Sequence, residues 1–158
     1  MKLNTSKKWM THALLAAEKA LAYGEVPVGA VIVKDDKIIE QGFNQMIMNN
    51  DPTAHAEIIA LRKTAQTIQN YRLPECDLYV TLEPCMMCLG AMIHARIRTL
   101  YFATTEPKAG AACSKASLHT LPFLNHYLSV EGGILANEAS QMLKAFFKTK
   151  RLQKRHNN

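Results

Sequence analysis

The chain has 158 residues, of which 48% are hydrophobic and 20% are charged, as in an ordinary globular protein. This length can bury one hydrophobic core but is short for two, so we expect residues 1–158 to form a single domain. The sequence lacks both a run of about 18 apolar residues and the apolar stretch of a secretion signal, which argues against a membrane span and predicts a cytoplasmic protein.

The formal net charge of +6 is concentrated at one end of the chain. Residues 1–143 carry thirteen basic and thirteen acidic side chains, whereas residues 144–158 carry six basic ones and no acidic one. These six are Lys144, Lys148, Lys150, Arg151, Lys154 and Arg155. Clustered Lys and Arg supply sequence-independent attraction to nucleic-acid phosphates. The segment is therefore either a phosphate-binding element or a solvated tail.

Helical and strand periods alternate along the chain, which is typical of an α/β protein. In order, the pattern predicts a helix over 6–23, strands over 26–33 and 37–44, a helix over 51–70, a strand over 78–82, a helix over 85–95 and a strand over 98–103. A long irregular segment over 104–125, a short strand and a basic helix over about 135–155 follow. We expect a three-layer α/β/α fold, with one mixed five-stranded sheet between helices on both faces. Its central strand–helix–strand unit implies a parallel strand pair.

The cysteines stand at positions 76, 85, 88 and 113. Two disulfides are not favoured, because a chain without a secretion signal is expected in a reducing compartment. The close pair Cys85 and Cys88 then indicates metal binding or redox chemistry. Cys76 and Cys113 have no close partner in the sequence, so we interpret them as small residues without a chemical role.

His55, Cys85 and Cys88 are candidate ligands of a zinc ion, because imidazole and thiolate groups suit Zn²⁺. Cys85 and Cys88 are three positions apart at a predicted helix start, where they share a face and the helix dipole favours the thiolate. His55 and Glu57 are two positions apart, so both can face one site only if it lies off the end of their helix. The pattern therefore predicts two helix N-termini that converge on one metal.

Three ligands leave the fourth zinc position open, which is typical of a catalytic site. A structural zinc site would need a fourth ligand, for which the candidates are Cys76, His94, Cys113 and His119. Interpretation of Cys85 and Cys88 as a redox Cys-x-x-Cys pair would not explain the His-x-Glu motif. These alternatives stay open at the level of the motif alone.

The combination of His-x-Glu with a later Pro-Cys-x-x-Cys resembles the signature of the zinc nucleobase deaminases. Strings at 26–31, 51–58, 70–73, 79–85 and 90–94 are similar to those of the bacterial tRNA adenosine deaminase family, and the resemblance extends from about residue 9 to 151. It implies a cytidine-deaminase-like fold, one Zn²⁺ per chain and a homodimer. The implied reaction is hydrolytic deamination of adenosine to inosine in a tRNA anticodon loop, at the wobble position.

The resemblance also implies how the site works. Zinc lowers the pKa of a bound water to about 7 and so supplies hydroxide at neutral pH for attack on C6 of adenine. Glu57 would be the catalytic residue that takes the water proton, delivers it to the ring nitrogen and protonates the leaving ammonia. The alternative for Glu57 is an exposed acidic residue favoured by the helix dipole.

Four residues are implied as substrate contacts. Asn44 would hydrogen-bond the target nucleoside, and Lys108 lies in a segment similar to a family loop along the RNA. Phe147 and Arg151, in the last helix, would contact the anticodon loop. A simple turn residue is the alternative for Asn44, and a core position is the alternative for Phe147 and the one we favour for Phe146.

Two residues depart from the family pattern, since Glu106 replaces a more frequent Asp and Cys113 a frequent Gly. Two rival functions remain. A deaminase of a free base or nucleoside would share the zinc site but has no need of a basic terminal helix. A binding module with structural zinc would fill the fourth ligand position. The apolar segment 46–48 is a candidate dimer contact that could equally be core.

Overall fold

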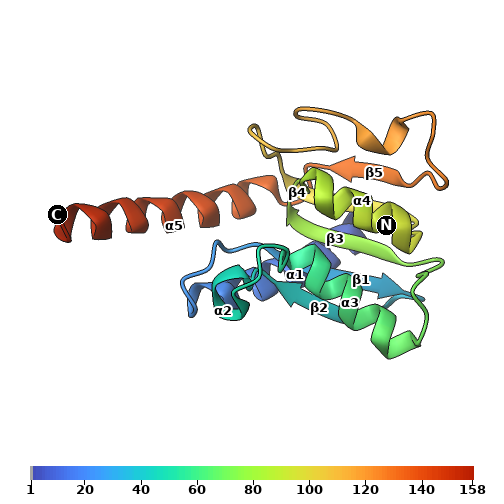
Figure 1. The fold of residues 1–158 in the computed structure, drawn as a ribbon, viewed down its shortest axis with the longest axis horizontal. Coiled ribbons are helices and arrows are strands. Elements are labelled where there is room, and N and C mark those ends of the chain that lie inside the picture. The colour runs from blue at the N-terminus through green and yellow to red at the C-terminus, as the bar shows by residue number, and fades with distance from the viewer. Residues whose placement is uncertain (1) are drawn as a thin grey trace.

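Five strands form one mixed sheet in the order β2-β1-β3-β4-β5 in the computed structural model, which describes residues 2–158 (Figure 1). The strands are β1 (Gly29–Lys34), β2 (Lys37–Phe43), β3 (Asp77–Leu82), β4 (Thr99–Thr104) and β5 (Ser129–Gly132). β1 is antiparallel to both β2 and β3, whereas β3, β4 and β5 are parallel. The predicted strand–helix–strand unit with a parallel strand pair is confirmed.

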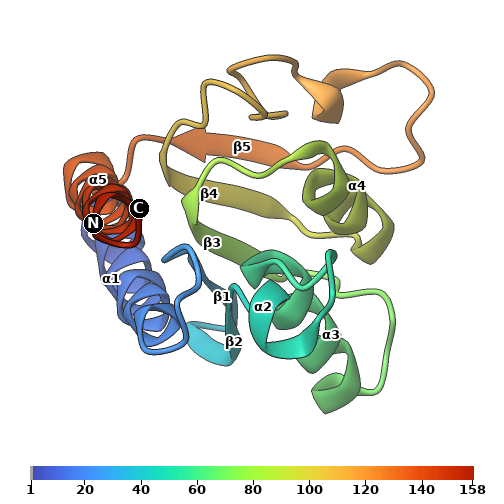
Figure 2. The same ribbon diagram turned by 60° about the vertical axis from the view of Figure 1, so that its left-hand side comes forward.

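Helices cover both faces of this sheet, so the predicted three-layer architecture is also confirmed (Figure 2). The helices are α1 (Lys2–Leu21), α2 (Met46–Asn49), α3 (Ala56–Ile68), α4 (Met86–Ala95) and α5 (Ala136–His156), with a short 3-10 turn at Leu118–Thr120. α1 packs on one face, and α3 and α4 pack on the other. None of the helices within residues 2–158 combines the length and apolar character needed to cross a bilayer.

Successive strand residues point to opposite faces of the sheet. Because helices cover both faces, both sets of side chains on the central strands are buried. On β1, Ala30 and Ile32 pack in the core beneath α3 and α4, while Val31 and Val33 pack against α1. Strands buried on both faces read as continuous apolar runs, which is the pattern that identified them in the sequence.

Gly29 lets α1 lie unusually close to the start of β1. A Cβ at this position would overlap the main chain of Ala13 and Ala17, so no other residue fits without displacing the helix. The facing side of α1 is built from buried alanines, which makes the approach possible. This contact fixes one helical layer against the sheet.

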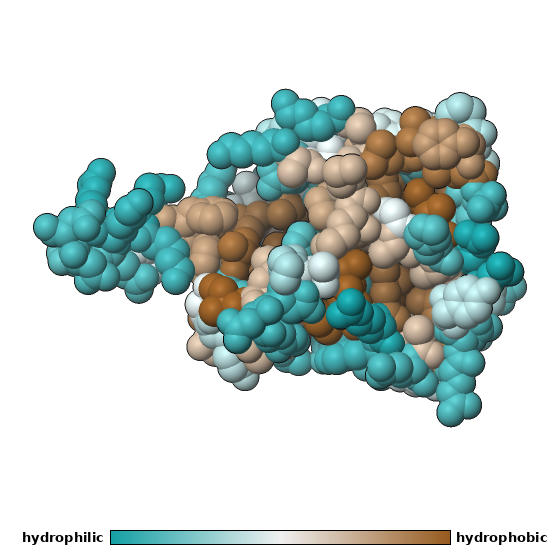
Figure 3. All heavy atoms as spheres, viewed as in Figure 1, coloured by the Kyte–Doolittle hydropathy of each residue, from teal (hydrophilic) through white to brown (hydrophobic). Residues whose placement is uncertain are grey.

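α5 starts against the sheet through the buried Ala139 and then extends away from it (Figure 1). Residues 147–158 are all exposed, and hydrophilic atoms cover the projecting end (Figure 3). Phe146 is half-buried, and Phe147 is exposed, so neither occupies the interior of the sheet core. The basic excess of the sequence is therefore displayed on one projecting helix.

Candidate metal centre and active site

The three candidate ligands meet where α3 and α4 begin. His55 is the N-cap residue of α3, Cys85 is the N-cap residue of α4, and Cys88 lies in the first turn of α4. Nδ1 of His55 is 3.7 Å from Sγ of Cys85 and 3.5 Å from Sγ of Cys88. Potential ligand atoms of all three residues lie within 4.8 Å of one another.

This arrangement fits a tetrahedral zinc ion. Bonds of about 2.1 Å to nitrogen and 2.3 Å to sulfur, at tetrahedral angles, place neighbouring ligand atoms about 3.6 Å apart. The two separations from His55 to the thiols are close to that value. The donor set of one imidazole and two thiols also matches the preference of Zn²⁺ for nitrogen and sulfur ligands.

The thiols influence each other strongly. A hydrogen bond with Cys88, supplemented by one with His55, lowers the pKa of Cys85 to about 4. The same bond to Cys85, together with burial, raises the pKa of Cys88. The hydrogen bond to Cys85 also raises the pKa of His55. Both contacts therefore favour the thiolate form of Cys85, which is the form that binds a cation.

Glu57 is a buried carboxyl group beside this cluster. It is the second residue of α3, and only 4% of it is exposed. Burial raises the pKa of Glu57, because a carboxylate loses its hydration there. A raised pKa makes a carboxylate a better proton acceptor, which suits a general acid–base. The interpretation of Glu57 as an exposed residue is therefore wrong.

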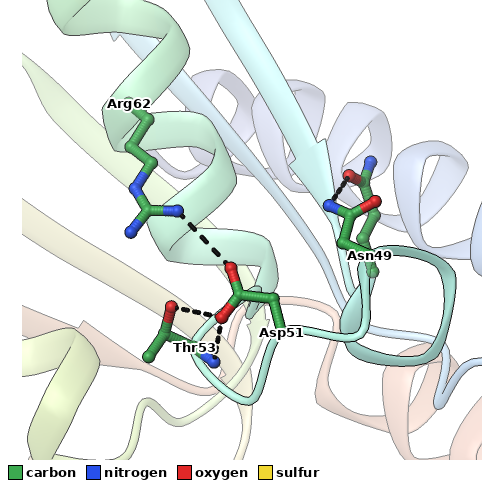
Figure 4. Close-up of polar contacts among 5 residues, drawn as sticks. Asn49, Asp51, Thr53 and Arg62 are labelled. Carbon is green, nitrogen blue, oxygen red and sulfur yellow. Dashed lines mark hydrogen bonds and ion pairs between the residues drawn. The ribbon is translucent and has the colours of Figure 1, made fainter.

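The segment before His55 explains why the ligand points off the end of α3. Oδ1 of Asp51 accepts hydrogen bonds of 2.8 Å from both N–H and Oγ1–H of Thr53, and Oδ2 of Asp51 lies 3.7 Å from Nη1 of Arg62 (Figure 4). These contacts form a turn, so α3 begins at Ala56 and not at residues 51–53 as predicted. His55 consequently has extended backbone and stands at the helix end.

Asn44 supports the start of α3. Its Oδ1 accepts a 2.9 Å hydrogen bond from the N–H of Ala56, and its Nδ2 donates to the carbonyl of Val26 at 3.1 Å. Asn44 thereby caps the helix that carries His55 and Glu57, in place of a capping bond from His55 itself. The sequence-based alternative of a simple turn residue does not describe this buried side chain.

Lys108, Phe147 and Arg151 are brought together by the fold, although they come from two distant segments. All three line one groove of about 620 Å³ between α5 and the segment after β4. Lys144, Lys150 and Lys154 also line it, as does Leu82 at the end of β3. His55 and Glu57 are not among the lining residues, so the groove does not contain the metal cluster; the lining residue Leu82 precedes Cys85 by three positions in the chain.

Two buried glutamates were missed in the sequence. The carboxylate of Glu25 accepts hydrogen bonds from the N–H groups of Ile47 (3.0 Å) and Met48 (3.1 Å) and so caps α2. The side chain of Ile47 is 64% exposed, so the core interpretation of segment 46–48 is wrong for this residue. Glu83 precedes Cys85 by two positions and binds the segment after β4. An ionisable residue next to an apolar strand was the signal available for each.

The pKa of Glu83 reflects its contacts. Burial by itself would raise it, but hydrogen bonds from Ser114, Cys113 and Glu106 outweigh that effect and hold the pKa at about 2. Glu83 is therefore an ionised carboxylate inside the protein, and its charge is compensated by the hydrogen-bond donors around it.

Comparison with known proteins places these features in a family. The model of the cytidine and deoxycytidylate deaminase zinc-binding region matches residues 3–104. The tRNA-specific adenosine deaminase of Haemophilus influenzae is 51% identical over 150 residues, covering 94% of this chain and 87% of the relative. The enzyme of the same name from Agrobacterium fabrum is 42% identical over 144 residues, covering 91% and 95%.

Solved structures agree with this assignment. A structure from work on A-to-I editing by tRNA:A34 deaminases at the wobble position of transfer RNA superposes with a TM-score of 0.84 at 41% identity, covering 86% of this chain and 99% of the other. A guanine deaminase from Nitrosomonas europaea has a TM-score of 0.75 at 24% identity, covering 89% and 83%, and so shares the fold. The chain belongs to the tRNA-specific adenosine deaminases, within the cytidine and deoxycytidylate deaminase family.

Proposed function

We propose that this protein is a zinc-dependent hydrolase that converts adenosine to inosine at the wobble position of a tRNA anticodon loop. The main support is the cluster of His55, Cys85 and Cys88 beside the buried Glu57, together with a separate groove lined by a basic helix. The first part of this arrangement suits hydrolytic deamination, and the second suits a nucleic-acid substrate.

His55, Cys85 and Cys88 would hold one Zn²⁺ per chain. When bound there, zinc supplies hydroxide at neutral pH by lowering the pKa of a water molecule to about 7. The convergence of two helix N-termini assists this, since their partial positive charge favours the thiolate form of the cysteines. Asn44 binds the start of α3 and thereby fixes the positions of His55 and Glu57 relative to each other.

Glu57 would carry the protons of the reaction. It would accept a proton from the attacking water and give it to the ring nitrogen next to C6 of adenine. It would then take the second proton, from the hydroxyl newly bonded to C6, and give it to the amino group, which leaves as ammonia while the C6 carbonyl forms. Its burial raises its pKa above that of an exposed glutamate, which favours the protonated form that a proton donor needs. Asn44 would add a hydrogen bond to the nucleoside with the capacity that its contacts to Ala56 and Val26 leave free.

The groove would receive the anticodon loop. A target base must leave the stack before its ring can enter a closed site, and in a hairpin loop this unstacking costs little free energy. Lys108 and Arg151 would bind phosphates, while Phe147, which is 45% exposed, offers an aromatic ring on which a base can stack. A free nucleoside has no phosphate groups that this basic surface could bind.

The remaining expectations also belong to this proposal. We infer that residues 1–158 act as one deaminase domain in the cytoplasm, where its tRNA substrate is found. We also infer a homodimer. Tyr71, after the end of α3, and Met86, at the start of α4, are exposed apolar side chains that such an interface would cover.

The proposal is tested with a synthetic anticodon stem-loop that carries adenosine at the wobble position. The zinc-loaded protein should release inosine, detected by nucleoside chromatography after digestion. The matched control places the same adenosine in the paired stem, where it should not react. Glu57→Ala protein serves as the second control. Absence of inosine from the loop substrate would contradict the proposed function.

A further inference from the structure

Glu83 lies in the chain between Leu82, which lines the groove, and Cys85, which belongs to the metal cluster. It follows β3 directly, and its N–H donates a 2.8 Å hydrogen bond to the carbonyl of Thr104. Two residues later the chain reaches Cys85 at the start of α4. The side chain of Glu83 is only 2% exposed, so its charge must be compensated by protein groups.

The compensation comes entirely from one loop, which we define as residues 105–114 and call the groove loop. Oε1 of Glu83 accepts hydrogen bonds from the N–H of Glu106 (3.0 Å) and from the hydroxyl of Ser114. Oε2 accepts from the N–H groups of Ala112 (3.1 Å), Cys113 (2.9 Å) and Ser114 (3.0 Å). Hydrogen bonds to an ionised acceptor are stronger than those between neutral groups.

Gly110 closes the groove loop around this carboxylate. A Cβ at position 110 would overlap the carboxylate atoms of Glu83, so the contact requires glycine. The next residue, Ala111, donates a 3.0 Å hydrogen bond to the carbonyl of Pro84. The groove loop is thus tied to residues 83–84 at its beginning, its middle and its end.

The groove loop also forms part of the groove. Thr105, Glu106, Pro107 and Lys108 line it opposite Phe147 and Arg151 of α5. Glu106 therefore lines the groove, while its N–H donates a hydrogen bond to the carboxylate of Glu83. The position of this wall relative to α5 depends on the hydrogen bonds that Glu83 accepts.

We propose that Glu83 is a positioning residue for RNA binding: it holds the groove loop as a preformed wall of the RNA groove. The inference rests on the proposed function in that it takes the ligand to be an RNA loop. A preformed wall saves the free energy of ordering the loop when RNA binds. Glu83 should consequently affect RNA affinity and KM more than kcat.

The first test is Glu83→Gln, measured with the anticodon stem-loop. An amide has one oxygen and one NH₂ group. Only the oxygen can accept hydrogen bonds from the groove loop, and the NH₂ group would face donors of that loop with donors of its own. We expect KM and the RNA dissociation constant to rise about tenfold while kcat stays within about threefold, the pattern of lost binding without lost chemistry. Zinc content should remain at one ion per chain.

The second test is a double-mutant cycle between Glu83 and Gly110. Gly110→Ala alone should raise KM as Glu83→Gln does, because its methyl group pushes the carboxylate aside. In the Glu83→Ala background the methyl group finds space, so Gly110→Ala should add little. Ser117→Ala is the control, because Ser117 lies outside the groove loop and is not among the hydrogen-bond donors to Glu83, and it should bind RNA like the unmodified protein.

RNA affinity is read by direct titration as well as by turnover, so that the two hypotheses fail separately. An unmodified protein that binds the stem-loop but makes no inosine would contradict the proposed function, and the titrations would still test Glu83. A Glu83→Gln protein that loses zinc, or that loses kcat at constant KM, would overturn the inference. Additive effects of the Glu83 and Gly110 changes would also overturn it.

Discussion

Nδ1 of His55 lies 3.5 Å from Sγ of Cys88, although 33 residues separate the two along the chain. Each residue stands at the beginning of a helix, and the two helices pack on the same face of the sheet. The positive ends of two helix dipoles therefore point at one cluster, where they favour the thiolate form of its cysteines. A metal ion at this point would tie α3 and α4 together.

Cys88→Ala should lower the zinc content from one ion per chain to nearly none. It should also lower the melting temperature, since binding of metal to the folded state adds to stability. Metal analysis of the purified protein by mass spectrometry measures the first effect. Cys76→Ala is the control, because this buried cysteine lies outside the cluster and should retain the zinc. Full zinc retention by Cys88→Ala would remove it from the ligand set.

Glu57→Gln should keep the fold and the zinc but lose turnover by about 10²- to 10⁴-fold, the usual contribution of general acid–base catalysis. The amide matches the carboxyl group in shape and cannot transfer the proton. Single-turnover deamination of the stem-loop, together with metal analysis, measures both properties. Loss of the metal would make Glu57 a ligand or its support, and a decrease of only a few-fold would deny it the proton-transfer role.

Asn44→Ala should lower the free energy of unfolding by about 1–2 kcal/mol, because it removes the cap of α3. Asn44→Asp keeps the acceptor for the N–H of Ala56 but turns a carboxylate oxygen toward the carbonyl of Val26, which repels it, so it should also destabilise the fold. Urea denaturation measures both. Asn49→Ala, at an exposed position, should be neutral. Unchanged stability of Asn44→Ala with lost activity would mean that Asn44 serves the substrate alone.

The contribution of the basic helix can be separated from general charge. Lys150→Gln with Arg151→Gln should weaken stem-loop binding and flatten the dependence of affinity on salt, with a slope change of about 0.7 for each lost phosphate contact to single-stranded RNA. Lys34→Gln with Lys37→Gln, at the turn between β1 and β2, removes the same charge elsewhere and should leave the slope unchanged. Equal effects of the two pairs would show that only net charge matters.

The fold could be predicted because its signals are local. Apolar runs such as those of β1 and β3 identify buried strands, and the short spacing from β3 through α4 to β4 leaves a parallel pair as the available connection. The grouping of the three candidate ligands could be predicted for a similar reason. Cys85 and Cys88 lie on one helical turn, and His-x-Glu stands at another helix start.

The start of α3 was predicted wrongly because two local structures share one signal. An aspartate before a helix can accept hydrogen bonds as an N-cap, or it can form a turn with the residue two positions later. Asp51 does the second with Thr53, and Asn44, from the end of β2, provides the cap. The choice between them depends on a contact that no local pattern reveals.

The buried glutamates were missed for the same physical reason. Glu25 caps α2 across 22 residues, and Glu83 accepts hydrogen bonds from residues 23 to 31 positions away. In the sequence each is an acidic residue that could equally be solvated. Only the fold supplies the donors that make their burial favourable.

The most direct measurement of the central hypothesis is a substrate comparison under identical conditions. The zinc-loaded protein is given an anticodon stem-loop with adenosine at the wobble position, free adenosine, free cytidine and free guanine, and released ammonia is followed for each. The proposed function predicts that the stem-loop is deaminated far faster than any free compound. It also predicts that the stem-loop rate at limiting RNA falls when Lys148, Lys150, Arg151, Lys154 and Arg155 are changed to Gln. Comparable or faster turnover of a free compound, unaffected by those changes, would contradict it and identify a small-molecule deaminase.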